Sequence, residues 1–241
     1  MDRALFAAAS GMAAQQQNLD TIANNLANAG VVGFKGSQDD FAALAGPGEP
    51  GAGTVRIGEH PLFTAGKLER SNGPFDVAID GEGFFLVTDG TRRAYTRAGE
   101  FSRAADGTLR NAQGWQLAGV HIPADARSAT VTPDGAVVVS GAGGSQTVAH
   151  VSLAQFPAPE RLQNTDGALF TQTRESGAPR WIAPGGPSGP TLRFGMLEQS
   201  NVSIVESMMQ ILTAQRAYEA NAKGIQAADE MLRIANNLQR G

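Results

Sequence analysis

The sequence has no cysteine, which excludes disulfide frameworks, thiolate nucleophiles and zinc sites built on cysteine. Aromatic residues make up only 6% of the 241 residues. The three histidines, His60, His121 and His150, lie far apart and lack a metal-ligand spacing such as His-x-x-x-His. We therefore expect no catalytic residue, no metal site and no cofactor, and we expect His150 to face solvent from a strand.

Charge and long apolar runs are also scarce. Charged residues account for 17% of the chain, the formal net charge is −4, and the largest basic cluster is the pair Arg92-Arg93. This composition argues against a nucleic-acid groove or a polybasic membrane patch. The chain has no apolar run of the roughly 18 to 20 residues that a membrane span needs. Its first residues lack a basic region followed by an apolar run, so we expect no cleaved signal peptide.

Glycine is abundant instead, with 30 residues. Gly81-Glu82-Gly83 lacks the third glycine of a dinucleotide-binding loop and is predicted to form a hairpin turn. Four aspartates stand next to or near glycines and are predicted to serve turns rather than to form a carboxylate pair: Asp76, Asp80, Asp89 and Asp106.

The first 29 residues predict a helix. Apolar residues recur there at intervals of seven, with Ile22 beside them: Leu5, Met12, Leu19 and Leu26. Such a repeat predicts a narrow apolar seam that packs against another helix. Gly30 follows in the place of a left-handed helix C-cap, and residues 31–35 are predicted to form a turn.

The last 40 residues predict a longer helix with the same interval. Its seam is formed by Ile204, Ile211, Tyr218, Ile225 and Leu232. Ser203 with Glu206 three residues later has the spacing of a capping box, so the helix is predicted over residues 203–238, with a length of about 54 Å.

Between these helices the apolar period changes from seven to two. Short strands are predicted at 76–79, 84–87, 115–117 and 149–153, with turns at 89–90, 106–107, 111–114 and 133–135. Segments rich in glycine and proline, 46–58 and 184–190, are predicted to be connectors.

These zones predict an α+β protein in which two terminal helices form a coiled-coil-like inner domain and carry an inserted, mainly antiparallel β domain. The expected divisions are the N-terminal helix and turn at 1–35, a connector at 36–69, the β domain at 70–183, a connector at 184–200, and the C-terminal helix at 201–241.

A single seam buries too little apolar surface to offset the entropy of ordering the long helix. Gly11 and Gly224 inside the helices favour close backbone approach. The helices therefore pair either with neighbouring copies or only with each other inside a monomer.

Three groups of motifs, in the same order, carry a resemblance to a known family. They are Ala23-Asn24-Asn25-Leu26-Ala27-Asn28 with Gly33-Phe34-Lys35; the segments 76–79, 81–85 and 95–101; and Ser200-Asn201-Val202 with 215–221 and 229–232. This pattern resembles the rod and hook family of axial proteins of the bacterial flagellum.

The resemblance implies a structural protein and not an enzyme. It implies a subunit that polymerises helically into the rod, the axial drive shaft between motor and hook, with copies of itself and neighbouring rod and hook proteins as partners. It also implies export through the flagellar type III apparatus without a cleaved signal, and a rod that crosses the periplasm. The terminal motifs are most similar to the distal rod type. Residues 37–64 form a shorter stretch than in that type, so a proximal rod subunit or a hook-type protein stays an alternative.

The resemblance and the seams together predict an assembly interface. Its expected residues are Leu5, Met12, Leu19, Ile22, Asn24, Asn25, Leu26, Asn28, Phe34, Asn201, Ile204, Ile211, Arg216, Tyr218, Asn221, Ile225 and Leu232. Three asparagines so close together on a helix are poor helix formers. We hypothesise that Asn24, Asn25 and Asn28 form amide hydrogen bonds between subunits, the alternative being a solvated face.

Two functions of other classes make different predictions for the sequence. An adhesive or carbohydrate-binding β protein oligomerised by its helices predicts a cleft with converging aromatic or carboxylate side chains, whereas the chain has two tryptophans and two tyrosines, all scattered. A hydrolase would need a nucleophile and a base, and the sequence displays no such pair.

Overall fold

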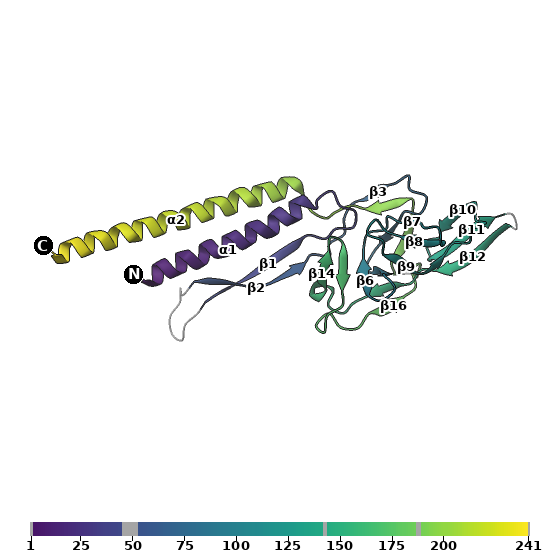
Figure 1. The fold of residues 1–241 in the computed structure, drawn as a ribbon, viewed down its shortest axis with the longest axis horizontal. Coiled ribbons are helices and arrows are strands. Elements are labelled where there is room, and N and C mark those ends of the chain that lie inside the picture. The colour runs from purple at the N-terminus through teal and green to yellow at the C-terminus, as the bar shows by residue number, and fades with distance from the viewer. Residues whose placement is uncertain (1, 45–52, 142–143, 187–188, 241) are drawn as a thin grey trace. The chain divides into compact units, whose positions relative to one another are not determined.

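The computed structural model describes residues 2–44, 53–141, 144–186 and 189–240, with the backbone alone for residues 2–4, 232 and 235–240. These residues form two helices and eighteen strands, which confirms the α+β class (Figure 1). The chain divides into two compact units. We call residues 1–27, 37–60 and 202–241 the helical unit, and residues 28–36 and 61–201 the β unit.

The helical unit contains α1 (Asp2–Ala27) and α2 (Ile204–Arg240), which lie side by side, with the chain's N-terminus and C-terminus at the same end of the pair (Figure 1). Strand β1 (Ser37–Ala43) packs along α1 and pairs with β2 (Thr54–Pro61). The sequence predicted only a connector at 36–69, so it missed the β1–β2 strand pair. Part of the expected 46–58 connector lies outside the described residues.

The helix ends agree in part with the prediction. At the start of α2, Ser203 Oγ accepts a hydrogen bond from the Glu206 amide at 3.4 Å, which confirms Ser203 as the N-cap. The predicted left-handed C-cap at Gly30 is wrong, because Gly33 is the first glycine of the chain that takes a positive φ, at 67°. The chain leaves α1 through turns at residues 28–30 and 32–33, with a bend at residue 31.

The β unit holds a nine-stranded antiparallel sheet. Seven strands follow the order β14-β15-β6-β5-β9-β8-β7, and β13 joins β5 to β16. Their bounds are β5 (Phe84–Thr88), β6 (Arg93–Thr96), β7 (Ser102–Arg103), β8 (Thr108–Arg110), β9 (Gln116–His121), β13 (Leu153–Gln155), β14 (Gln163–Asp166), β15 (Leu169–Thr171) and β16 (Arg180–Ile182).

Smaller sheets complete this unit. One has three antiparallel strands, and the others are pairs: β10 (Ser128–Val131), β11 (Ala136–Gly141) and β12 (Gly144–His150); β4 (Val77–Asp80) with β17 (Thr191–Phe194); and β3 (Leu68–Arg70) with β18 (Met196–Glu198). A short 3₁₀ helix spans Pro159–Arg161.

Most of the predicted strands and turns are confirmed, and two predictions are wrong. The predicted strand 149–153 is interrupted at residues 151–152, because the chain passes there from the sheet of β12 to that of β13. Gly81-Glu82-Gly83 is not a hairpin turn, since it joins β4 and β5, which belong to different sheets. Glycines with positive φ do occupy the predicted turns at Gly90, Gly107, Gly114 and Gly135. His150 is exposed, as expected.

The aspartates expected in turns have several roles. Asp89 accepts hydrogen bonds from the amides of residues 91 and 92, and Asp106 from that of residue 108, as turn aspartates do. Asp80 departs from the expectation, because its carboxylate pairs with Arg193 across the β4–β17 ladder at 2.9 Å. Asp76 is buried and accepts a hydrogen bond from the Ser71 hydroxyl.

Candidate assembly surface and buried junction

The first turns of α2 expose large apolar side chains together. We call Ile204, Val205, Met208, Met209 and Leu212 the α2 apolar face; each is between 52% and 69% exposed. At spacings of one, four and five residues, these side chains lie on one side of the helix. Exposed apolar side chains gathered on one side of a helix are typical of interaction surfaces, so this face is the candidate for one.

The face of α2 that is buried within the chain is lined by small residues instead. Ser207, Ala214 and Ala228 are buried, and Asn221 is half-buried. These four residues also recur at intervals of seven, but each lies three residues after a member of the predicted seam. Small side chains allow two helix backbones to approach. At Gly11 of α1, a Cβ atom would lie 3.1 Å from Asn221 Nδ2, whereas a Cβ at Gly224 would meet nothing within 4 Å.

The predicted interface residues are therefore divided between several environments. Ile22 and Phe34 are buried; Leu5, Met12, Leu19, Asn25, Leu26, Asn28, Asn201, Ile211, Asn221 and Ile225 are half-buried; Asn24, Ile204, Arg216 and Tyr218 are exposed. The side chain of Leu232 lies outside the described residues. Phe34 and Asn201 belong to the β unit, apart from the helix seam.

Asn25 has a role inside the chain. Its amide Nδ2 donates to the Ser37 carbonyl at 2.7 Å, and its Oδ1 accepts from the Ser37 amide at 2.8 Å. A carboxamide has one face that donates and one that accepts, so it pairs with a single backbone residue as a strand neighbour does. Asn25 thus fastens the start of β1 to α1. The intersubunit role for Asn24 and Asn28 stays a prediction.

The Gly33-Phe34-Lys35 motif enters the β unit through a tight approach. Gly33 has a φ of 67°, and its amide donates to the Glu198 carbonyl at 2.7 Å. A Cβ at this position would lie 2.3 Å from the backbone nitrogen of Ala98. Only glycine fits here, for both conformational and steric reasons.

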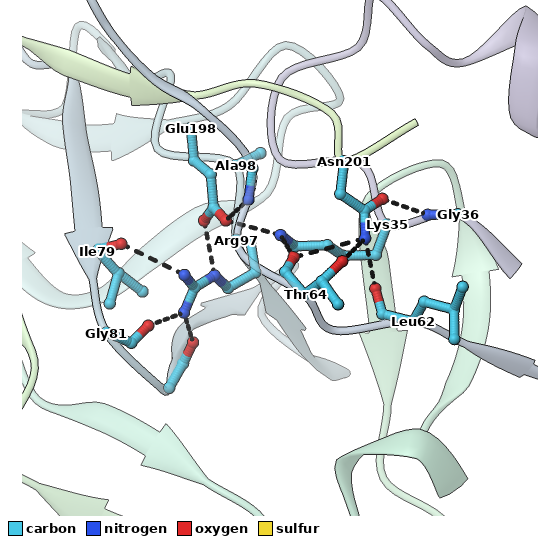
Figure 2. Close-up of polar contacts among 12 residues, drawn as sticks. Lys35, Gly36, Leu62, Thr64, Ile79, Gly81, Arg97, Ala98, Glu198 and Asn201 are labelled. Atoms are coloured by element: carbon cyan, nitrogen blue, oxygen red, sulfur yellow. Dashed lines mark hydrogen bonds and ion pairs between the residues drawn. The ribbon is translucent and has the colours of Figure 1, made fainter. Parts of the chain in front are cut away.

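Glu198 lies at the centre of a buried ion cluster. Its Oε1 accepts from Lys35 Nζ at 2.6 Å and its Oε2 accepts from Arg97 Nε at 2.7 Å, and both ion pairs are almost wholly buried (Figure 2). Lys35 Nζ also donates to the Thr64 carbonyl at 2.7 Å. Arg97 donates to the carbonyls of residues 79, 81 and 83. Three segments distant in sequence thus meet at one carboxylate.

Burial and pairing act against each other in this cluster. Burial alone would raise the pKa of Glu198, but the charges and hydrogen bonds of Arg97 and Lys35 outweigh it and hold this pKa below its ordinary value. Burial is the larger effect at Lys35 and lowers the pKa of its ammonium, although Glu198 opposes the change. The carboxylate therefore stays ionised at neutral pH, as a buried charge does only when it is paired.

Asn201 lies beside the ion cluster and bonds in two directions. Its Oδ1 accepts from the Gly36 amide at 2.9 Å, and its Nδ2 donates to the Leu62 carbonyl at 2.7 Å and to Thr64 Oγ1 at 2.8 Å (Figure 2). Together with the ion cluster it forms what we call the junction: Lys35, Gly36, Leu62, Thr64, Arg97, Glu198 and Asn201.

Three family models match the chain. Residues 5–35 match "Flagella basal body rod protein", residues 78–139 match the D1 domain of "Flagellar hook protein FlgE/F/G", and residues 194–238 match the C-terminal model "Flagellar basal body rod FlgEFG protein".

The flagellar basal-body rod protein FlgG of Borreliella burgdorferi is 39% identical, with 100% of both chains covered. The FlgG protein of Agrobacterium fabrum is 35% identical, with 97% of this chain and 98% of that protein covered. The chain belongs to the flagellar basal-body rod protein family. The FlgF rod protein of Caulobacter vibrioides is 30% identical, covering 98% of this chain and 97% of its own.

Membership in the rod family makes this chain a structural protein of the flagellar basal body. Among the residues that the structure describes, no helix combines the length and apolarity that a membrane crossing requires.

Sequence reasoning found part of the junction of this rod protein and missed its centre. Asn201, the Gly33-Phe34-Lys35 motif and the segment 95–101 that contains Arg97 came from the family resemblance, but Glu198 was not selected. Glu198 follows Leu197 at the end of a short strand and shows no pattern of its own. Its significance depends on Lys35, which lies 163 residues away in sequence.

The β unit also holds a cleft of about 810 Å³. Its aromatic lining consists of Phe63, Phe84 and Phe156, and Phe63 and Phe84 pack edge to face with ring centroids 5.0 Å apart. Neither tryptophan lines this cleft. Glu82 and Gln155 also line the cleft and hydrogen-bond to each other at 2.9 Å. The cleft therefore has side chains of the kinds that the carbohydrate-binding alternative predicts, and it is the match to rod proteins along the whole chain that decides against this alternative.

Proposed function

We propose that this chain is a subunit of the distal rod, which polymerises helically into the axial drive shaft and transmits torque from motor to hook. The observation that carries this proposal is the match along the whole chain to FlgG rod proteins of several bacteria. A proximal rod subunit is the second candidate, favoured by the match to FlgF. The alignment with the Borreliella protein spans 265 positions against 241 residues here, in line with a shorter segment in this chain.

The helices are the assembly elements in this proposal. Residues 1–35 and 201–241 form a coiled-coil-like inner layer, and the β domain, residues 70–183, sets the outer surface. The α2 apolar face supports this arrangement, because it is exposed in the single chain and needs a partner. Contacts that repeat by a rotation that does not close on itself generate a tube. Torque then passes through many staggered helix contacts.

The partners follow from the same assignment. The chain assembles with copies of itself and with neighbouring rod and hook proteins, and the flagellar type III apparatus exports it without a cleaved signal. The rod then crosses the periplasm as part of the basal body. Family membership supports the partners in the rod, and the resemblance alone supports the export route.

Electron microscopy of basal bodies tests the proposal. A strain that lacks this chain should form no complete rods, and the intact chain should restore them. Deletion of residues 205–241 should abolish restoration while circular dichroism still shows a folded β unit. Complete rods in the strain without the chain would contradict the proposed function.

Point variants test the α2 apolar face itself. The double variant Met208→Gln/Leu212→Gln should reduce the number of complete rods at least tenfold, because polar side chains replace the contact surface. The matched control Lys223→Gln/Glu230→Gln changes exposed residues of the same helix and should assemble normally. Equal rod numbers for both variants would rule out this face as a contact.

A further inference from the structure

The chain passes between the helical unit and the β unit four times. The crossings follow Ala27, Gly36, His60 and Asn201. Each crossing is a single stretch of backbone, which has two soft dihedral angles per residue and bends easily. Contacts that join one crossing to another hold these points together.

One side chain joins three of the four crossings, and it does so inside the β unit. Asn201 is the last β-unit residue before α2, and its Oδ1 accepts from the amide of Gly36, the last β-unit residue before β1. Its Nδ2 donates to the carbonyl of Leu62, one residue after the return from β2. The Leu62 amide donates to the Gly36 carbonyl at 2.8 Å, which closes the ring of hydrogen bonds.

The ion cluster supports this ring from the adjacent residues. Lys35 precedes Gly36, Thr64 follows Leu62 by two residues, and Glu198 precedes Asn201 by three. Lys35 Nζ contacts both Glu198 and the Thr64 carbonyl, so the same three segments are joined a second time (Figure 2). Asn201 itself is half-buried and lies outside both apolar clusters of the β unit. Its loss therefore leaves the core packing in place.

We infer that Asn201 is a positioning residue for rod assembly: its amide clamps together the three points at which the chain leaves and re-enters the β unit. The inference rests on the proposed rod function. The clamp holds the three exit points at fixed positions relative to one another within the β unit. An asparagine suits this task because one carboxamide accepts at one crossing and donates at another.

The test compares Asn201→Ala and Asn201→Asp in the full chain with the control Asn164→Ala. Asn164 Nδ2 donates to the Gly167 carbonyl at 3.1 Å inside one turn of the same unit, so the control removes an amide of the same kind that joins no crossings. For Asn201→Ala we expect amide hydrogen exchange at Gly36 to rise at least tenfold and complete rods to fall at least fivefold. The thermal midpoint should stay within about 3 °C of the control.

Asn201→Asp separates the two halves of the clamp. Aspartate keeps an acceptor for the Gly36 amide but loses the donor to Leu62, so slow exchange at Gly36 should persist while rod numbers fall to an intermediate value. Rods of Asn201→Ala as numerous as those of the control would overturn the inference. A fall in the number of rods together with a thermal midpoint more than about 3 °C below that of the control would also overturn it, because that result indicates a loss of stability. If the intact chain itself restores no rods, the proposed function fails instead.

Discussion

The two units of this chain treat their apolar residues in opposite ways. In the β unit, Phe85, Leu153 and Phe170 are fully buried. In the helical unit, Val205 is 69% exposed and Met209 57%, on a helix whose inward face carries alanine and serine. The β unit buries most of its large apolar side chains, whereas the helical unit leaves a row of them exposed in the single chain.

Both units contain buried charge, since Asp39 of β1 is buried and pairs with Arg56 of β2 in the helical unit. The β unit buries an ion cluster in which one carboxylate serves two cations, and such a cluster is stable only when every member is in place. Within the described residues of α1 and α2, the buried residues are small or apolar, with Thr21 and Ser207 the polar ones. Among these described helix residues, no charged side chain is buried.

The largest expected effect contrasts a buried with an exposed apolar side chain. Phe85→Ala should lower the free energy of unfolding by about 3–5 kcal/mol, because it leaves a cavity beside Phe101, whose ring centroid lies 5.8 Å away. Met208→Ser should change the free energy of unfolding of the monomer by no more than about 0.5 kcal/mol. Urea unfolding monitored by circular dichroism measures both. Similar losses for the two variants would break the contrast between the units.

The next effect is the pH dependence of the ion cluster. The pKa of Glu198 lies below its ordinary value of 4.5 in the folded chain, so its ionised form stabilises the fold above that pH, and the stabilisation is lost as the pH falls through the lowered pKa. Glu198→Gln should cost about 3 kcal/mol near neutral pH, because Lys35 and Arg97 stay buried without their anion.

Unfolding experiments from pH 7 down to pH 3 provide the measurement. The difference in unfolding free energy between the intact chain and Glu198→Gln should shrink as the pH falls below about 4.5. Glu69→Gln, an exposed residue on the neighbouring strand, is the matched control. A difference that stays constant over this pH range would show that Glu198 does not act through its charge.

The last comparison takes one glycine from each unit, and its smaller effect is at Gly224. Gly33→Ala should destabilise the β unit by at least about 1–2 kcal/mol from its left-handed backbone alone, with the contact to Ala98 adding to this. Gly224→Ala should instead stabilise α2 by about 1 kcal/mol, because the position is open in this chain and alanine favours a helix. Thermal unfolding checks both signs. Gly30→Ala, which has open space and no positive φ, is the control for Gly33.

The sequence predicted the elements that depend on local chemistry. The Ser203 cap, both long helices and the glycine turns follow from residues close together in the chain, and the structure confirms them. The heptad repeat correctly indicated helices with an apolar side. It did not reveal which side of α2 faces α1, because large residues and small residues both recur at intervals of seven.

By itself, then, the sequence determined the α+β class, the helical ends and the rod-family motifs, since periodicity, caps and turn residues act over a few positions. Only the tertiary structure decided that small residues of α2 face α1 while the α2 apolar face stays exposed. It alone also showed that Glu198 and Asn201 tie Lys35, Gly36 and Leu62 together. Burial of a charge and the sharing of one amide between distant segments are properties of the folded chain, because they depend on which segments meet.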